Sequence, residues 1–442
     1  MDGTRQPTDL TGNGENGAEE ELPDLTADDV EEIHDQPEGD DEPMDDGDDG
    51  EDGDDGDDKM VIHDSSIAAF YGARGESIFT IAMHPKFPSP PLAVSGGSDD
   101  TSFIWNVTDG EIVQQLLPKH KDSVTMVGWN ADGTLVATGG MDGIINVFAC
   151  QSPGDWTQWK HLVALEGGDE VQFLTWHPKG NVLAAGYGDC TCWMWQLPKG
   201  DVMNVFTGHE DAVTAGRFTP DGRKLMTTST DGSLIIYDPR QPAPLSKLGS
   251  SDSRFASEGG FVCLAISPDS KLAAVGSVTG QARVVSLVGV DQGGGLSVVS
   301  ALAGHIDGES IEGIAFIDLL ANTAGGVGHL VTAATDGKAV VWDLQTKQVR
   351  VECVHYDSDE NGQDTSDGGA LTTLVVHEAG PLFTTASSSG TLRTWDARSG
   401  NVLAKHEGFT DGVLDADVKP DGKGGWSVVG AGDEGVALIF KC

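Results

Sequence analysis

Positively charged residues are scarce in this sequence. Lysine and arginine together number 26, against 71 aspartates and glutamates, so the formal net charge is −45 at pH 7. A protein that binds nucleic acid neutralises phosphates with lysine and arginine, so this balance disfavours direct contact with nucleic acid. A basic protein is the partner that such a charge favours.

Long apolar runs and paired cysteines are also missing. No apolar run is long enough to cross a membrane, and the N-terminus has no basic and apolar signal segment. The six cysteines are scattered, and the close pair Cys190 and Cys192 lacks the further ligands of a zinc site. We therefore expect reduced thiols, no metal or other cofactor, and a monomer in the cytoplasm or the nucleus.

A short phrase recurs eight times between Ser95 and Phe440. It consists of small residues, a turn position that is often aspartate, and an aromatic or apolar residue six positions later. The copies end at Trp105, Phe148, Trp195, Tyr237, Val285, Trp342, Trp395 and Phe440, which are 42 to 57 residues apart. A period of about 40–45 residues, with Gly-His early and Trp-Asp late, is typical of WD40 repeats.

The units between these copies have the pattern of strands. Short apolar or β-branched runs alternate with turns such as Thr219-Pro220-Asp221-Gly222, and no stretch shows sustained helical periodicity. The sequence therefore predicts an all-β, eight-bladed WD40 β-propeller over residues 61–442. The chain ends just after the third strand of unit eight, so we expect a strand near residues 66–71 to complete that blade.

Residues 1–60 have a different composition. They hold 26 acidic side chains against Arg5 and Lys59, and almost no aromatic residues. Such a segment cannot bury enough apolar surface to fold alone, so we expect a disordered acidic tail. The tail carries −24 of the net charge and the remaining residues carry −21, so the predicted propeller is itself acidic.

No group of residues predicts catalysis. The histidines and aspartates of the repeat, such as His209 with Asp231 and His305 with Asp336, are expected to form a structural network within each blade. No phosphate-binding glycine loop is present. We therefore expect a protein that is not an enzyme.

The repeat assigns each charged loop to one face of the ring. The loops that enter the first strand of each unit open on one face, the top, and include a long insertion between His355 and Gly369. Acidic residues close to the channel mouth there are the candidate partner-binding residues: Glu76, Asp122, Glu170, Asp211, Glu309, Glu312, Asp411 and Asp433. An acidic mouth would steer and hold an arginine- and lysine-rich peptide.

The opposite face, the bottom, is expected to be near neutral. Its turns carry as many acids as basic residues, and the basic ones are Lys86, Lys179, Lys199, Arg223, Lys224, Arg240, Lys271, Lys347, Arg398, Lys419 and Lys423.

With its acidic N-terminus, its eight units and its acidic top face, the chain resembles the family of the animal angio-associated migratory cell protein. That family includes a fungal counterpart that is a dedicated ribosomal-protein chaperone. The segment from Phe70 to Thr80 and the Trp105-Asn106 end of unit one support the resemblance. It implies an escort that holds the basic N-terminal segment of a 60S ribosomal protein, L ten in the older naming, on the top face. Unit five departs from the pattern at Gly260 and Thr279.

Two other functions fit the same sequence. Trp395-Asp396-Ala397-Arg398 matches a signal seen in WD40 substrate receptors of ubiquitin ligases, and Tyr237-Asp238-Pro239-Arg240 nearly matches it. A histone-binding propeller would use an acidic surface equally well. The sequence does not separate one basic client from another.

Overall fold

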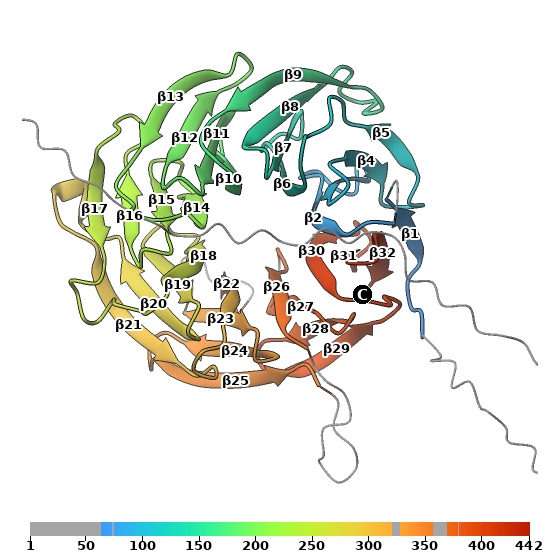
Figure 1. The fold of residues 1–442 in the computed structure, drawn as a ribbon. Coiled ribbons are helices and arrows are strands. Elements are labelled where there is room, and N and C mark those ends of the chain that lie inside the picture. Colours follow the sequence, from blue (N-terminus) through green and yellow to red (C-terminus); the bar gives the residue numbers. More distant parts are fainter. Residues whose placement is uncertain (1–62, 73–74, 321–327, 357–368, 379) are drawn as a thin grey trace, which may run out of the picture. The chain divides into compact units, whose positions relative to one another are not determined.

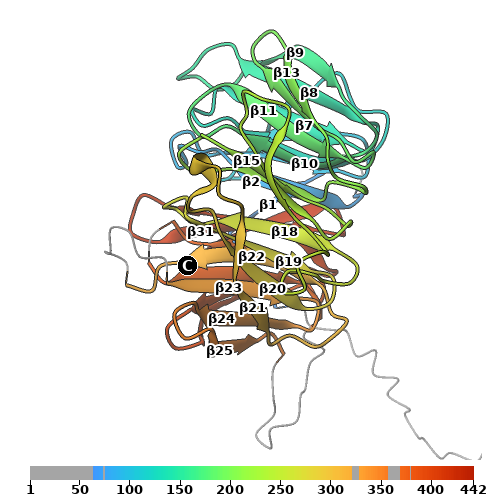
Figure 2. The same cartoon turned by 90° about the vertical axis from the view of Figure 1, so that its left-hand side faces the viewer.

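The computed structural model describes residues 63–72, 75–320, 328–356, 369–378 and 380–442. The described residues belong to one unit of the chain, Met60–Cys442, which is separate from Met1–Lys59. The predicted acidic tail and residues 357–368 of the predicted insertion lie outside the described residues. Within the unit Met60–Cys442, eight antiparallel sheets of four strands each form a propeller (Figure 1), which Figure 2 shows edge-on. The predicted all-β, eight-bladed fold is confirmed.

Blades 1 to 4 each use four consecutive strands, from the inner to the outer edge. They are β2 (Ile78–Met83), β3 (Leu92–Gly97), β4 (Ser102–Asn106) and β5 (Ile112–Gln115); β6 (Val124–Trp129), β7 (Leu135–Gly140), β8 (Ile144–Cys150) and β9 (Trp159–Glu166); β10 (Val171–Trp176), β11 (Val182–Tyr187), β12 (Cys192–Gln196) and β13 (Asp201–Phe206); and β14 (Ala215–Phe218), β15 (Leu225–Thr228), β16 (Leu234–Tyr237) and β17 (Pro244–Leu248).

Blades 5 to 7 repeat this order, and blade 8 takes one strand from the N-terminal side. They are β18 (Phe261–Ile266), β19 (Leu272–Ser277), β20 (Gln281–Ser286) and β21 (Ser297–Ala303); β22 (Ile311–Ile317), β23 (His329–Ala334), β24 (Lys338–Asp343) and β25 (Gln348–Val354); β26 (Leu371–Val376), β27 (Leu382–Ser387), β28 (Leu392–Asp396) and β29 (Asn401–His406); and β30 (Val413–Pro420), β31 (Trp426–Gly432), β32 (Val436–Lys441) and β1 (Ala68–Tyr71). Among the described residues the one helical element is a 3-10 turn, η1 (Val290–Gln292).

The inner strands close a ring around a central channel. In order around it, β2, β6, β10, β14, β18, β22, β26 and β30 each contact the next, and β30 contacts β2. The eight phrase-ending residues all lie on the third strand of a blade and are 0–2% exposed: Trp105, Phe148, Trp195, Tyr237, Val285, Trp342, Trp395 and Phe440. Burying a large apolar side chain contributes about 1.5–3 kcal/mol, so this position anchors every blade in the core.

Blade 8 is completed by the strand nearest the N-terminus. β1 pairs antiparallel with β32, with Ala68 opposite Ile439 and Tyr71 opposite Val436. Phe70 is 1% exposed and stacks on Trp105 of blade 1, with ring centroids 4.7 Å apart. β1 therefore joins the last blade to the first through both backbone pairing and core packing.

Candidate partner-binding site

Eight equivalent loops lead into the inner strands, and one hydrogen bond fixes their alignment. In seven blades, the residue that follows the second strand donates its N–H to the carbonyl just before the inner strand, and in blade 4 an equivalent bond forms slightly farther from the strand ends. The donor and acceptor pairs are Ser98 to Ser77, Met141 to Ser123, Gly188 to Glu170, Thr230 to Ala212, Val278 to Gly260, Thr335 to Ser310, Ser388 to Ala370 and Asp433 to Gly412. Equivalent positions in the eight loops can therefore be compared residue by residue.

The position just before each accepting residue is acidic in six blades. We call these six residues the acidic rim: Glu76, Asp122, Asp169, Asp211, Glu309 and Asp411. Gly259 and Gly369 occupy the position in blades 5 and 7. Repetition at one structural position places like charges at matching points around the ring, which concentrates negative potential there.

Hydrogen bonds between blades place the rim loops next to one another. The Thr125 hydroxyl donates to the Val171 carbonyl at 3.3 Å, and the Thr214 hydroxyl donates to the Phe261 carbonyl at 2.6 Å. The Thr372 hydroxyl donates to the Val413 carbonyl, also at 2.6 Å. Each bond links the start of one inner strand to the start of the next. The acidic rim therefore runs around one mouth of the channel.

Three rim carboxylates share one local geometry. In Asp122, Asp211 and Asp411, Oδ1 accepts the N–H of the next residue at 2.8 Å. All three side chains are exposed. Among the described residues no donor meets the other oxygen of these carboxylates, so each has an acceptor available for a cationic partner.

The other predicted acids differ in how far they are engaged by the protein. Glu309 is half-buried and its Oε2 accepts the Thr335 hydroxyl at 2.6 Å, while Asp433 Oδ1 accepts the Ser77 hydroxyl at 2.5 Å. Glu76 and Glu170 are exposed. Glu170 lies one position after the rim, where Asp169 stands. The rim thus contains Asp169, which the candidate set omitted because two consecutive acids precede that strand.

Glu312 lies deeper than the rim. It occupies an irregularity at the start of β22 and lines a cavity of about 310 Å³ within the ring of inner strands. Arg217 lines the same cavity, and its Nε donates to the Leu264 carbonyl of the next blade at 2.9 Å. Arg217 partly offsets the charge of Glu312 inside the channel, so the negative potential is concentrated at the mouth.

Two basic residues near the rim, Lys247 and Arg254, are paired with carboxylates, while Lys119 and Lys121 are exposed. Lys247 Nζ contacts the Gly208 carbonyl at 2.7 Å and Asp231 Oδ2 at 3.6 Å. Arg254 donates from Nε and Nη2 to the two oxygens of Asp252 at 3.1 and 2.8 Å. Arg74, also expected on this face, lies outside the described residues.

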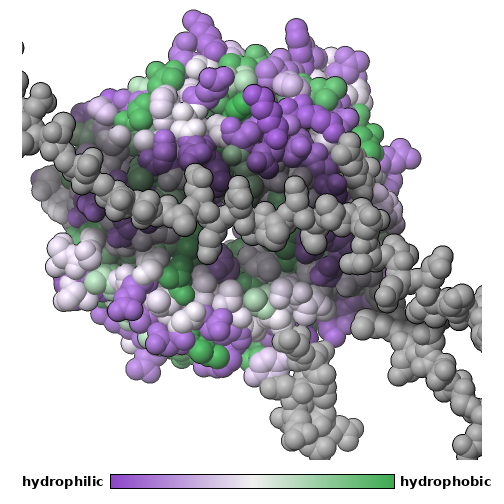
Figure 3. All heavy atoms as spheres, in the orientation of Figure 1, coloured by the Kyte–Doolittle hydropathy of each residue, from purple (hydrophilic) through white to green (hydrophobic). Residues whose placement is uncertain are grey.

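On the face drawn in Figure 3, hydrophilic side chains gather most densely over the part of the ring where Figure 1 draws blades 1 and 2.

The histidine–aspartate pairs of the repeat are structural, as predicted. His305 Nδ1 lies 3.0 Å from Asp336 Oδ2, and His305 Nε2 lies 2.7 Å from the Thr332 hydroxyl, which also accepts Trp342 Nε1–H at 2.9 Å. His209 makes the matching contact with Asp231 at 3.5 Å. Burial would raise the pKa of Asp336, but the hydrogen bond to His305 holds that pKa below its usual range.

Neither a metal site nor a membrane-spanning helix is found in the part of the chain that the structure describes. No cluster of three or more histidine, cysteine or acidic side chains there has the geometry to hold a metal ion. None of its helices has the length and apolar character to cross a membrane.

The fold and the repeated network define this chain as a WD-repeat propeller. The family described as "WD domain, G-beta repeat" matches residues 110–148 and 200–238, and the "Anaphase-promoting complex subunit 4 WD40 domain" matches residues 155–215. Within this class, the chain belongs to the family of the angio-associated migratory cell protein. The Homo sapiens member is 32% identical over 358 residues, which cover 79% of this chain and 75% of that protein.

Two fungal relatives extend the comparison. The "Ribosome assembly protein SQT1" of Saccharomyces cerevisiae is 25% identical over 401 residues, which cover 84% of this chain and 86% of that protein. The crystal structure of Chaetomium thermophilum Sqt1 bound to the N-terminus of the ribosomal protein L10 superposes with a TM-score of 0.74. That chain is 26% identical, and the match covers 86% of this chain and all of that one.

Proposed function

We propose that this protein is a non-enzymatic escort that binds the basic N-terminal segment of a large-subunit ribosomal protein for assembly of the 60S subunit. The acidic rim carries the proposal, because six of eight equivalent loops place a carboxylate at one mouth of the channel. A fungal relative of the same fold binds the N-terminus of ribosomal protein L10, which supports a ribosomal client here. Such an escort would act in the cytoplasm or the nucleus.

The rim suits an arginine- and lysine-rich segment for two physical reasons. Clustered carboxylates accelerate the encounter with a cationic peptide, and the effect weakens as salt screens the charges. Carboxylates with an available oxygen then accept charge-assisted hydrogen bonds from arginine. Glu170 and Glu312 would add acceptors just inside the rim, and Asp433 would add a charge beside it.

Charge reversal at the rim and just inside it tests this function. We expect the triple variant Glu76→Lys/Glu170→Lys/Glu312→Lys to bind the N-terminal peptide of ribosomal protein L10 at least tenfold more weakly than the parent. The parent should form a 1:1 complex that weakens as salt rises, measured by isothermal titration calorimetry. None of the three side chains accepts a hydrogen bond from the residues that the structure describes, so the variant should melt like the parent.

A second triple variant provides the control. Glu111 and Asp155 are exposed acids in turns between third and fourth strands, and Asp201 is the exposed first residue of the fourth strand β13. All three lie away from the rim, and their reversal to lysine changes the charge equally. This control should bind like the parent. Equal binding by the parent and the Glu76→Lys/Glu170→Lys/Glu312→Lys variant would disprove the proposal. Preferential binding of a histone-tail peptide over the L10 peptide would favour the histone alternative instead.

The structure gives the ligase alternative no specific support. Arg398 donates to both oxygens of Asp396 at 3.0 and 2.8 Å, and Arg240 makes the same pair with Asp238. Arg254 and Asp252 pair identically in a loop without the preceding tryptophan. The Asp-x-Arg pair is therefore explained by local turn geometry.

A further inference from the structure

A second cavity lies between blades 3 and 4, at the opposite end of the inner strands from the acidic rim. Its volume is about 570 Å³, within the range of ligand-binding pockets. The turn β14–β15 and the turn β16–β17 form part of its wall, and η1 contributes Asp291. Because turns between first and second strands lie at the C-terminal ends of the inner strands, this cavity faces away from the channel mouth that carries the rim.

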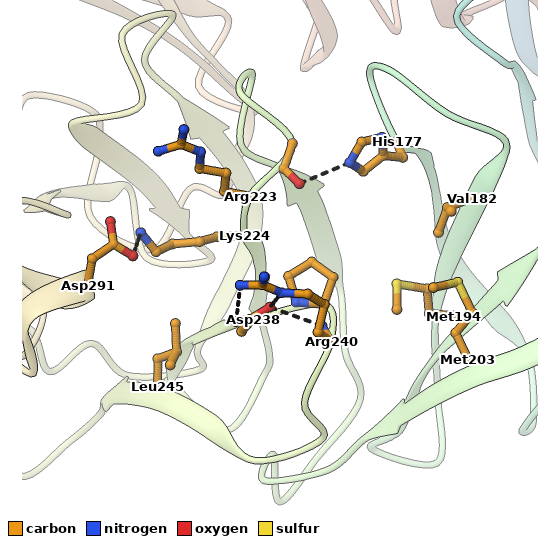
Figure 4. Close-up of a pocket in the computed structure, with 12 residues that line it drawn as sticks. His177, Val182, Met194, Met203, Arg223, Lys224, Asp238, Arg240, Leu245 and Asp291 are labelled. Carbon is orange, nitrogen blue, oxygen red and sulfur yellow. Dashed lines mark hydrogen bonds and ion pairs between the residues drawn. The ribbon is translucent and has the colours of Figure 1, made fainter.

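One wall of this cavity is apolar. Val182, Met194 and Met203 come from three strands of blade 3 and lie together, whereas Leu245 of β17 lies on the other side of Asp238 and Arg240 (Figure 4). Met203 and Leu245 are each 41% exposed, although both are large and hydrophobic. Methionine side chains adapt to varied partners, so this wall can receive one bulky apolar side chain.

The other wall is cationic. Arg223 is 79% exposed, and its Nε is 3.8 Å from Asp221 Oδ2, too far for a strong hydrogen bond. Arg240 is 84% exposed and donates Nε and Nη2 to Asp238, which leaves Nη1 without an acceptor among the described residues. The two guanidinium groups are thus available to an incoming carboxylate.

The remaining charged and polar groups of the cavity are already paired. Lys224 Nζ lies 2.5 Å from Asp291 Oδ1, and His177 Nε2 lies 2.9 Å from the Gly222 carbonyl while its Nδ1 accepts the Lys179 N–H. These contacts hold the turn that carries Arg223 (Figure 4). The cavity is therefore a fixed apolar recess beside two arginine donors, and aromatic, methionine and arginine side chains are those enriched at protein interfaces.

We propose that this cavity binds a short acidic segment of a second protein partner, with one bulky apolar side chain against Met194 and Met203 and carboxylates on Arg240 and Arg223. Charge complementarity selects this occupant. Each arginine would donate hydrogen bonds to a carboxylate of the segment, whereas both repel the basic client proposed for the rim. Two partners of opposite charge could then be bound at once on opposite faces of the propeller.

A peptide selection tests the proposal on the full chain. A random heptapeptide phage library is selected on the parent and counter-selected on the double variant Met203→Glu/Arg223→Glu. We expect enrichment of peptides that pair a large apolar residue with aspartate or glutamate. The synthetic peptide should bind the parent and lose at least tenfold in affinity on Met203→Glu and on Arg223→Glu separately, measured by fluorescence polarisation.

Two matched variants control for stability and general charge. Val202→Glu changes the neighbouring residue on the same strand, which is 51% exposed and does not line the cavity, and Arg398→Glu changes an equivalent Asp-x-Arg turn in blade 7. Both should bind the selected peptide like the parent. Selection that yields only basic peptides, or peptides that bind parent and cavity variants alike, would overturn the proposal. Binding of the L10 peptide by Met203→Glu should stay unchanged, which separates this test from that of the rim.

Discussion

At the scale of single residues, the histidines and aspartates that recur in the repeat differ in role from the acidic residues beside them. Asp336 and His305 are almost fully buried, with 0% side-chain exposure, and bond to each other. Asp122 and Asp411 are exposed, and each has an oxygen without a described donor. Buried polar groups need partners within the fold, whereas exposed carboxylates can change partners. Burial therefore separates structural aspartates from candidate binding ones.

Removal of the Thr332 hydroxyl should destabilise the protein, because this group links buried polar side chains of the repeat. Thr332 Oγ1 accepts Trp342 Nε1–H at 2.9 Å and contacts His305 Nε2 at 2.7 Å. Thr332→Val keeps the shape of the side chain but leaves buried polar groups unpaired, so we expect the free energy of unfolding to fall by about 1–3 kcal/mol. Urea denaturation followed by tryptophan fluorescence measures this loss. Thr207→Val, at an exposed position, should be neutral, and an equally neutral Thr332→Val would refute the structural role.

At the scale of elements, the short strand β1 closes the ring of blades. Its four residues pair with β32, and Phe70 packs with Ile439 and Trp105 in the cluster between blades 8 and 1. Without β1, the outer edge of β32 would be unpaired and that cluster would lose a buried aromatic ring. Closure of the ring is thus carried by residues far from the C-terminus in sequence.

Truncation tests this closure. Deletion of residues 1–72 should lower the melting temperature strongly, whereas deletion of residues 1–62, whose composition predicts no core, should change it little. Phe70→Ala keeps the strand and should still cost about 3–5 kcal/mol, so the prediction remains testable if the longer deletion does not fold. Differential scanning fluorimetry compares the three. Equal melting of both truncations would mean that β1 does not secure the ring.

Elements also mark the limit of what the sequence predicts. The eight third strands were predictable because each ends in an aromatic or apolar residue such as Trp195 or Phe440 at a regular spacing. The register of blade 3 was not, since Asp169 and Glu170 are equivalent in a sequence pattern and differ only in the backbone bond that Glu170 accepts. The cavity beside Met203 also escaped prediction, because it needs strands of blade 3 and turns of blade 4 to meet. Contacts between blades are not encoded in the repeat of one blade.

At the scale of the whole molecule, the junction that closes the ring contains two carboxylates. Asp415 Oδ2 accepts the Ile81 N–H at 2.9 Å, and Asp417 Oδ2 accepts the Met83 N–H at 2.7 Å. Both aspartates lie on β30 and both donors on β2, so these bonds join blade 8 to blade 1. The pKa of Asp415 is raised to about 7, chiefly by desolvation at this junction. The nearby Asp417 also raises this pKa, and the N–H donors partly oppose the increase.

The raised pKa makes the junction sensitive to pH in a defined direction. Between about pH 4 and pH 7 the unfolded chain has lost this proton and the folded chain keeps it, so unfolding releases a proton. The contribution of Asp415 to stability is therefore present at low pH and declines as pH rises towards 7. Asp415→Asn cannot ionise, so its melting temperature should rise relative to the parent's as pH increases from 4.5 to 7.5. Asp307→Asn, an exposed control, should follow the parent throughout. A constant difference between Asp415→Asn and the parent across this range would show that Asp415 does not titrate there. Its protonation state would then be the same at every pH tested.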